Sequence, residues 1–211
     1  MKSTVLALLL MSSLAFGQKL QDVSPKDSPL SLSIKIDASD GQPAVFAHSS
    51  SRKGILALAV AVRFTDARGQ ETRLRASQDY AFKLEPLKFQ EERPIGPGQG
   101  FDRSIKITKA VGAVLFVQFE DGSTWGDAET GSRLRATRPQ KLAFLKRLVE
   151  AYYESGEEAF NRILDDPNLP MTEWVVSGCL KAEAEYEKTA PIDLAKKKLA
   201  AAQGWYASGL F

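Results

Sequence analysis

The chain has 211 residues, and its 28 basic and 26 acidic side chains nearly cancel, leaving a formal net charge of +2. This balance gives no long-range attraction toward nucleic acid or an anionic membrane, so neither is expected as a partner. An apolar share of 44% is typical of a folded chain and excludes an intrinsically disordered one.

The chain begins with MKSTVLALLLMSSLAFGQ, which has the pattern of an export signal. Lys2 supplies a positive start, and the apolar run from Val5 to Phe16 is too short to span a bilayer. The small residues Ala15 and Gly17 predict cleavage after Gly17. We therefore expect residues 1–17 to be a signal peptide and the mature protein to be periplasmic or secreted, without membrane insertion.

Residues 18–30 are polar and contain Pro25 and Pro29, which predicts a flexible or extended lead-in. Short runs with strand periodicity follow between residues 31 and 127. Their turns recur at regular spacing, which predicts an antiparallel β-sandwich. The expected strands are Ser31–Asp37, Ala44–His48, Ile55–Phe64, Glu71–Ala76, Phe101–Ile107 and the stretch that begins at Ala110. The segment Ile55–Phe64 is apolar on both faces almost to its end, so we expect it at the centre of a sheet.

The stretch Ala110–Asp127 reads as a long strand, a two-residue Asp121-Gly122 turn and a return strand with Trp125. Alternation places Val111, Ala113, Leu115, Val117 and Phe119 on one face of this strand. A two-residue turn sets Gln118 opposite Trp125, so that Trp125 shares the other face with Phe116. We therefore expect Phe116 and Trp125 at the contact with the following helices, near Leu145, Tyr152 and Trp174.

The arrangement of these elements carries a resemblance. A two-faced apolar strand, the hairpin Asp66-Ala67-Arg68-Gly69, and a Pro-Gly loop over Pro94–Gly100 resemble features of bacterial exported immunoglobulin-like or fibronectin-like modules. The resemblance covers Ser31–Asp127 and implies a sandwich that binds or scaffolds without catalytic residues. The Cys and Trp framework of antibody domains is missing here, since no cysteine lies in this region.

Beyond a polar connector over Asp127–Thr137, the apolar residues recur at helical spacing, which predicts a helical unit of three to four helices over residues 138–206. Pro139 is suited to a first helical turn, and Ser155-Gly156 predicts an end or a kink. A further helix should begin near Met171, with Met171, Trp174, Val175, Cys179 and Ala182 on its inner side. The overall fold class is therefore α+β, with the helices after the strands and packed on them.

The sequence offers few residues for catalysis. His48 is the single histidine and Cys179 the single cysteine, which excludes a zinc site with two histidines and leaves a catalytic triad without support. We expect no catalytic residue, metal or cofactor. Cys179 is interpreted as a small buried hydrophobe, with a disulfide-linked dimer as the alternative.

Six residues are candidates for binding. Arg63, Arg73 and Arg75 form either an anion-binding patch or a charged face that protects a sheet edge. The aromatic residues Trp125, Tyr152 and Trp174 line either a ligand groove or the core.

These patterns favour an exported, non-catalytic binding or scaffold protein whose partner is an unknown protein or envelope component. The alternative is a small hydrolase of glycans or peptides that uses a carboxylate pair among Glu157, Glu158, Asp165 and Asp166. That chemistry needs two carboxylates that face each other at about 5–10 Å.

Overall fold

The computed structural model describes residues 20–36, 43–82, 85–95 and 107–210. Strands occupy the first part and helices the last part of this region, which confirms the predicted α+β class. The predicted signal peptide, most of the predicted strand Phe101–Ile107 and most of the Pro-Gly loop lie outside the described residues.

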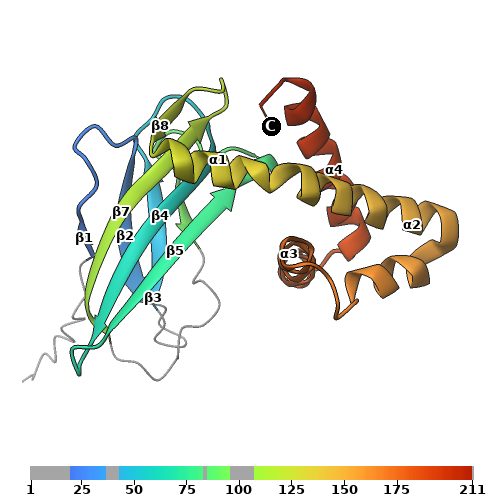
Figure 1. Ribbon diagram of the computed structural model, residues 1–211, viewed down its shortest axis with the longest axis horizontal. Coiled ribbons are helices and arrows are strands. Elements are labelled where there is room, and N and C mark those ends of the chain that lie inside the picture. Colours follow the sequence, from blue (N-terminus) through green and yellow to red (C-terminus); the bar gives the residue numbers. More distant parts are fainter. Residues whose placement is uncertain (1–19, 37–42, 83–84, 96–106, 211) are drawn as a thin grey trace, which may run out of the picture.

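The strands form two sheets (Figure 1). Sheet A has the order β1-β7-β4-β5, with β8 paired to β7, and sheet B has the order β2-β3-β6. Sheet A contains β1 (Leu20–Asp22), β4 (Ile55–Asp66), β5 (Glu71–Asp79), β7 (Ile107–Phe119) and β8 (Thr124–Gly126). Sheet B contains β2 (Leu30–Ile36), β3 (Pro43–Ser49) and β6 (Glu92–Ile95).

The prediction of purely antiparallel sheets is wrong, because β1 pairs in parallel with β7. This strand lies within the predicted lead-in, which is therefore part of the fold from Leu20 onward. Leu20 is buried, the Asp22 carboxylate accepts a hydrogen bond from the backbone N–H of Leu32, and Val23 donates to the carbonyl of Gly112. The charged end of β1 thus links the two sheets.

The prediction that Ile55–Phe64 is a central strand is confirmed, since β4 lies between β5 and β7. Leu58, Val60, Val62 and Phe64 face sheet B and belong to the core between the sheets. The alternate residues Ala57, Ala59, Ala61 and Arg63 therefore lie on the face turned away from sheet B, called the outer face here.

The predicted alternation along β7 fails at its centre. The register with β4 shifts between Ala59 and Val60, which face Phe116 and Val114, so that Leu115 is an extra residue. A bulge of this kind reverses the side-chain phase. Val114 faces the sandwich core before the bulge, Val117 does so after it, and the predicted single face is wrong.

The hairpin after β7 has a three-residue loop instead of the predicted two-residue turn. Phe119 donates to the carbonyl of Ser123, and Gly122 donates to the carbonyl of Phe119. Only Gly122 in this loop has a positive φ, of 84°, as in a type I turn followed by a left-handed residue. The extra residue moves Trp125 opposite Val117, so Trp125 packs on the core between the sheets and is not at the helices.

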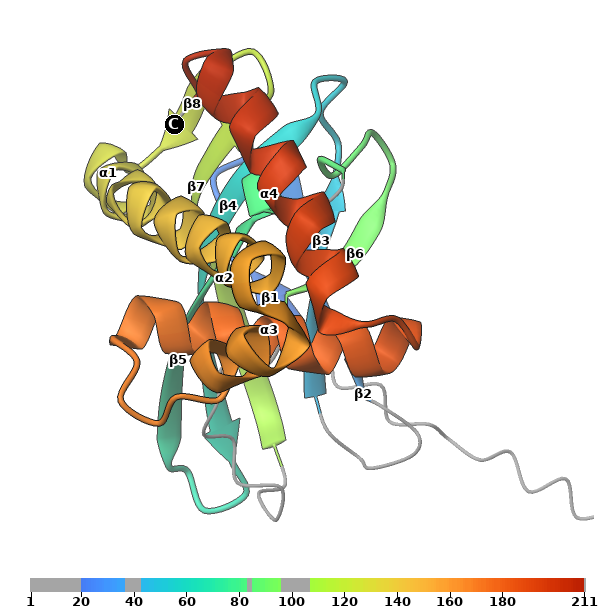
Figure 2. The same cartoon turned by 90° about the vertical axis from the view of Figure 1, so that its right-hand side faces the viewer.

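The helices lie on the outer side of sheet A (Figures 1 and 2). They are α1 (Ala128–Ala136), α2 (Arg138–Leu164), α3 (Met171–Glu187) and α4 (Pro191–Ala207), with a short 3₁₀ turn η1 (Tyr80–Phe82) after β5. Helix α1 contacts β7, and α4 contacts η1. The predicted break near Gly156 is a kink, where φ is 79°. A second hydrophobic core joins the helices to Leu56 of β4 and Phe82 of η1. None of the described helices is long and apolar enough to cross a bilayer.

Helix α1 replaces the connector that was predicted over Asp127–Thr137. The Asp127 carboxylate accepts hydrogen bonds from the backbone N–H groups of Glu129 and Thr130 and caps the first turn. Glu129 in the first turn and Arg133 and Arg135 in the last turn complement the helix dipole. These caps and charges were the signals of a helix start and end, although the segment lacks a broad apolar face.

We expect Asp127→Ala to lower the midpoint of thermal denaturation, because Asp127→Ala removes the cap, whereas Asp127→Asn preserves it. The hydroxyl and N–H of Thr130 hold the pKa of the Asp127 carboxyl below its usual value. A lowered native pKa stabilises the fold above the pKa of unfolded aspartate, and this contribution is lost as the pH falls through the native value. Calorimetry across acidic pH should show wild type converging on Asp127→Ala, and a constant gap would contradict this assignment.

Candidate functional site

A groove of about 420 Å³ separates the outer face of sheet A from the helices. Its sheet side includes Ala59, Arg75, Ser77 and Leu115, and its helix side includes Thr130, Arg133, Lys141, Met171 and Val175. The sheet side is built by alternation along β4 and β5, which sends these side chains away from sheet B. None of the described residues that line the groove is acidic, and three of them are basic. The groove is thus an open space with basic side chains on both walls.

The structure brings together the three arginines that the sequence singled out. Arg63 pairs across the strands with Arg73, and Ala61 pairs with Arg75, so all three arginines lie on the outer face and are exposed. We call them the arginine row. Arg63 lies 3.5 Å from Glu71, whereas the side chains of Arg73 and Arg75 have no ion-pair partner among the described residues. The row leads from the uncovered end of β4 and β5 into the groove.

The three aromatic candidates are not brought together. The Trp125 Nε1–H group donates to the Asp27 carboxylate at 3.2 Å, on the sandwich side of the molecule. Tyr152 packs within the helical core, at 6.4 Å from the Phe160 ring. Phe116 does face the helices, but it is buried beneath Gly131 of α1 and does not belong to the helical core that contains Leu145 and Tyr152.

Helix α3 is turned opposite to the prediction. Met171, Val175, Cys179 and Ala182 are exposed, and Trp174 beside them is 43% exposed. The buried face of α3 consists instead of Ser177, Leu180 and Ala184, with the Ser177 hydroxyl donating to the carbonyl of Leu164. The interpretation of Cys179 as a buried hydrophobe is therefore wrong, and the predicted apolar stripe borders the groove at Met171 and Val175.

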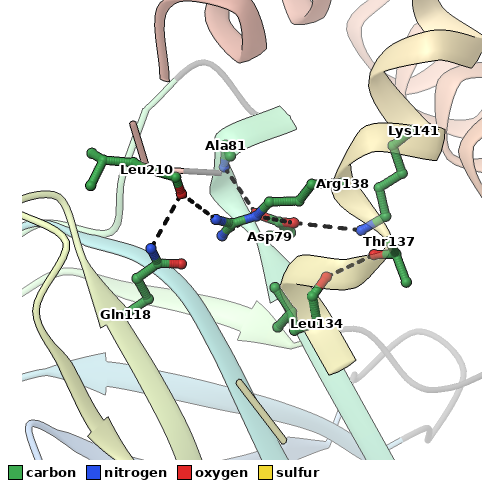
Figure 3. A network of polar contacts seen from close by, with 8 residues as sticks. All are labelled: Asp79, Ala81, Gln118, Leu134, Thr137, Arg138, Lys141 and Leu210. Atoms are coloured by element: carbon green, nitrogen blue, oxygen red, sulfur yellow. Dashed lines mark hydrogen bonds and ion pairs between the residues drawn. The ribbon is translucent and has the colours of Figure 1, made fainter. Parts of the chain in front are cut away.

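A buried ionic network that the sequence did not reveal fixes the two sides of the groove (Figure 3). Arg138, at the start of α2, donates from Nε and Nη2 to the Asp79 carboxylate at 3.0 and 3.1 Å. Its Nη1 donates to the carbonyl of Leu210 at 2.7 Å, and that carbonyl also accepts from Gln118 at 3.3 Å. Lys141 adds a longer contact of 3.5 Å to Asp79. The network joins β5, β7, α2 and the segment after α4.

The carboxylates proposed for hydrolysis lie away from the groove and are exposed. Asp165 pairs with Lys181 at 2.7 Å, and Glu158 lies 4.0 Å from Arg162. The Asp166 carboxylate accepts from the backbone N–H of Asn168 in the turn after α2. These contacts are those of helix ends and surface pairs.

Two further polar residues, His48 and Asp121, lie in a strand and in a hairpin loop. His48 pairs with Ser31 and Glu92 in the middle strand of sheet B. Asp121, in the hairpin loop, is bound to Lys53 at 2.6 Å, and that contact lowers the pKa of its carboxyl. Among the described residues, no group of three or more histidine, cysteine, aspartate or glutamate side chains is arranged to hold a metal ion.

Comparison with known proteins adds a distant structural likeness. No protein-family model matches the chain, and no curated protein matches it. The chain is similar to a hypothetical protein from Peptoclostridium difficile 630, whose X-ray structure was determined at 1.85 Å, with 12% identity and a TM-score of 0.32. The similarity covers 53% of this chain and 92% of that chain.

Proposed function

We propose that this protein is an exported, non-catalytic binding or scaffold protein, and that its binding surface is the groove with the α3 face beside it. One observation carries the proposal: the apolar side chains of Met171 and Val175 on α3 and the guanidinium of Arg75 on β5 line the same open space. Met171 is 75% exposed and Val175 is 45% exposed. Exposed apolar patches rimmed by polar groups are typical of interaction sites.

The position of the groove supports this role. Binding sites are often found where two packed units meet, because each unit contributes a wall of different character. Here one wall is a sheet face with small residues such as Ala59, and the other is a helix with large flexible side chains such as Met171. Methionine adapts its shape to different partners more readily than branched side chains do.

The comparison with the hydrolase alternative rests on charge. Glycoside or peptide hydrolysis by paired carboxylates needs two acids facing the substrate. The groove instead presents basic side chains. Arg133 and Lys141 already pair with Glu129 and Asp79, whereas Arg75 has no ion-pair partner among the described residues and suits the binding of an anionic group. We therefore place binding ahead of hydrolysis.

Two further expectations form part of the proposal. The partner is a protein or another component of the cell envelope, as the export signal implies. The kinship with exported immunoglobulin-like modules is kept as an expectation, because such modules present binding surfaces on a pair of packed sheets. Cys179 lies on the exposed face of α3, so a disulfide-linked dimer through Cys179 is the alternative way to cover that face.

The test is a chemical cross-linking capture from the native envelope with three versions of the protein. We expect wild type to capture a stoichiometric partner and Val175→Lys to lose it, because a charge placed on the apolar wall must be desolvated on binding. Phe89→Lys is the matched control, since Phe89 is an exposed apolar residue in another part of the fold. It should retain the partner.

Two outcomes would contradict the proposal. If Val175→Lys and Phe89→Lys capture the partner equally well, the binding surface lies elsewhere. If the protein turns over a glycan or peptide library and one Asp or Glu substitution abolishes that turnover, the protein is an enzyme.

A further inference from the structure

The apolar stripe on α3 extends beyond Met171 and Val175, the two of its residues that line the groove. Met171, Val175, Gly178, Cys179, Ala182 and Tyr186 recur at helical spacing and are all exposed; we call them the α3 stripe. From Met171 to Tyr186 the stripe extends about 22 Å along the helix axis. Its opposite face already packs on the helical core. A continuous apolar stripe of this kind usually packs against another helix.

The shape of the α3 stripe suits a helix. Its ends carry large side chains, Met171 and Tyr186, which are 75% and 88% exposed. Its middle is small, and a Cβ atom added at Gly178 would have no atom within 4 Å. Small residues between large ones let the side chains of a second helix approach the backbone closely.

The surface across from the α3 stripe carries arginine side chains, which favour a negatively charged ligand. Helices cover one end of sheet A, and the other end of β4 and β5 extends past them (Figure 2). The arginine row lies on the outer face of these strands, and Arg75 itself lines the groove. Arg75 has no side-chain partner among the described residues, so its charge is available to a ligand. A segment lying on the α3 stripe would place its flank against these guanidinium groups.

From this complementarity we infer that the groove binds an acidic amphipathic helix of a partner polypeptide, a conclusion that rests on the proposed function. The apolar side of that helix covers the α3 stripe, and carboxylates along its flank pair with the arginine row. An extended segment added to the edge strand β5 would leave the α3 stripe bare, so the helix accounts for more of the exposed surface.

The test uses a designed peptide of about 18 residues, which forms a helix about 27 Å long. The acidic peptide carries Leu along one stripe and Glu on the flanks, and the control peptide has Lys in place of every Glu. Fluorescence anisotropy should show that the acidic peptide binds about tenfold more tightly than the Lys peptide, and that salt weakens its binding. The single thiol of the protein reports the site, because maleimide labelling of Cys179 should slow when the acidic peptide is bound.

A charge reversal checks the arginine row. Arg75→Glu should weaken the acidic peptide about tenfold and strengthen the Lys peptide. Arg162→Glu is the matched control, because Arg162 is exposed on α2 and does not line the groove; it should leave both affinities unchanged. Circular dichroism establishes that each variant is folded.

Several outcomes would overturn the inference. If the acidic and Lys peptides bind equally well, the groove does not select for negative charge. If a peptide slows amide exchange in β5 without protecting Cys179, it binds as an added strand. Preferential binding of dodecanoate or of phosphatidylglycerol vesicles indicates a lipid ligand, and a dimer that excludes the peptide places a second copy on the stripe. If Val175→Lys loses its captured partner while the acidic peptide fails to bind, the binding role stands and only the acidic helix is wrong.

Discussion

Arg138→Met is expected to lower the free energy of unfolding by about 3–5 kcal/mol, the range observed when one member of a buried ion pair is removed. The Arg138 side chain is fully buried, and that of Asp79 is 6% exposed. Met has a similar length but cannot donate a hydrogen bond, so Asp79 would keep Lys141 as its cation at 3.5 Å. The carbonyl of Leu210 would also lose its shortest donor. Urea denaturation followed by circular dichroism measures the change.

Arg162→Met provides the matched control, because Arg162 lies on the same helix in an exposed pair with Glu158. Exposed pairs contribute about 0–1 kcal/mol. If both substitutions had equally small effects, the buried network would not hold the helices to the sheet. The double variant Arg138→Met with Asp79→Leu should be less destabilised than the sum of the single variants, because neither charge is then left behind.

Gly131→Ala should destabilise the protein by about 1–3 kcal/mol through overpacking, although alanine is ordinarily the better residue inside a helix by about 1 kcal/mol. A Cβ atom at position 131 would fall on the Phe116 ring, 2.6 Å from its Cζ. Phe116 is fully buried beneath α1, so the ring has little freedom to move aside. The same denaturation experiment measures this change.

Whether a Gly→Ala substitution lowers or raises stability shows whether a steric clash or helix propensity dominates at that position. Gly204 also lies inside a helix, α4, but a Cβ atom there would have no neighbour within 4 Å. Gly204→Ala should therefore leave stability unchanged or raise it by up to about 1 kcal/mol. Stabilisation by Gly131→Ala would mean that α1 does not rest on Phe116.

Local patterns predicted much of the fold. The apolar run Ile55–Phe64 became the central strand, because strand residues covered on both sides must be apolar on both faces. Gly156 marked a kink, and the strand spacing of Arg73 and Arg75 placed these two on one face, where the pairing of the strands adds Arg63. Each of these predictions depended on a local pattern within a single segment of the chain.

The errors arose where one residue or one distant partner decides the outcome. A bulge at Leu115 reversed the side-chain phase within β7, and a three-residue hairpin loop moved Trp125 to the opposite face. In α3, the apolar stripe predicted a packed face, but periodicity does not say whether the partner is in the same chain. Asp79 and Arg138 are 59 positions apart, so no local pattern joins them.

The contact at Arg138 has a consequence for how the molecule responds to heat or denaturant. The sheets and the helices have separate hydrophobic cores, an arrangement that often permits stepwise melting. Here one guanidinium binds both the end of a strand and the chain after the last helix, so neither layer can loosen without exposing the charge that the other needs. Cooperativity between the two layers is therefore expected to depend on this side chain together with the packing of Leu56 and Phe116 against the helices.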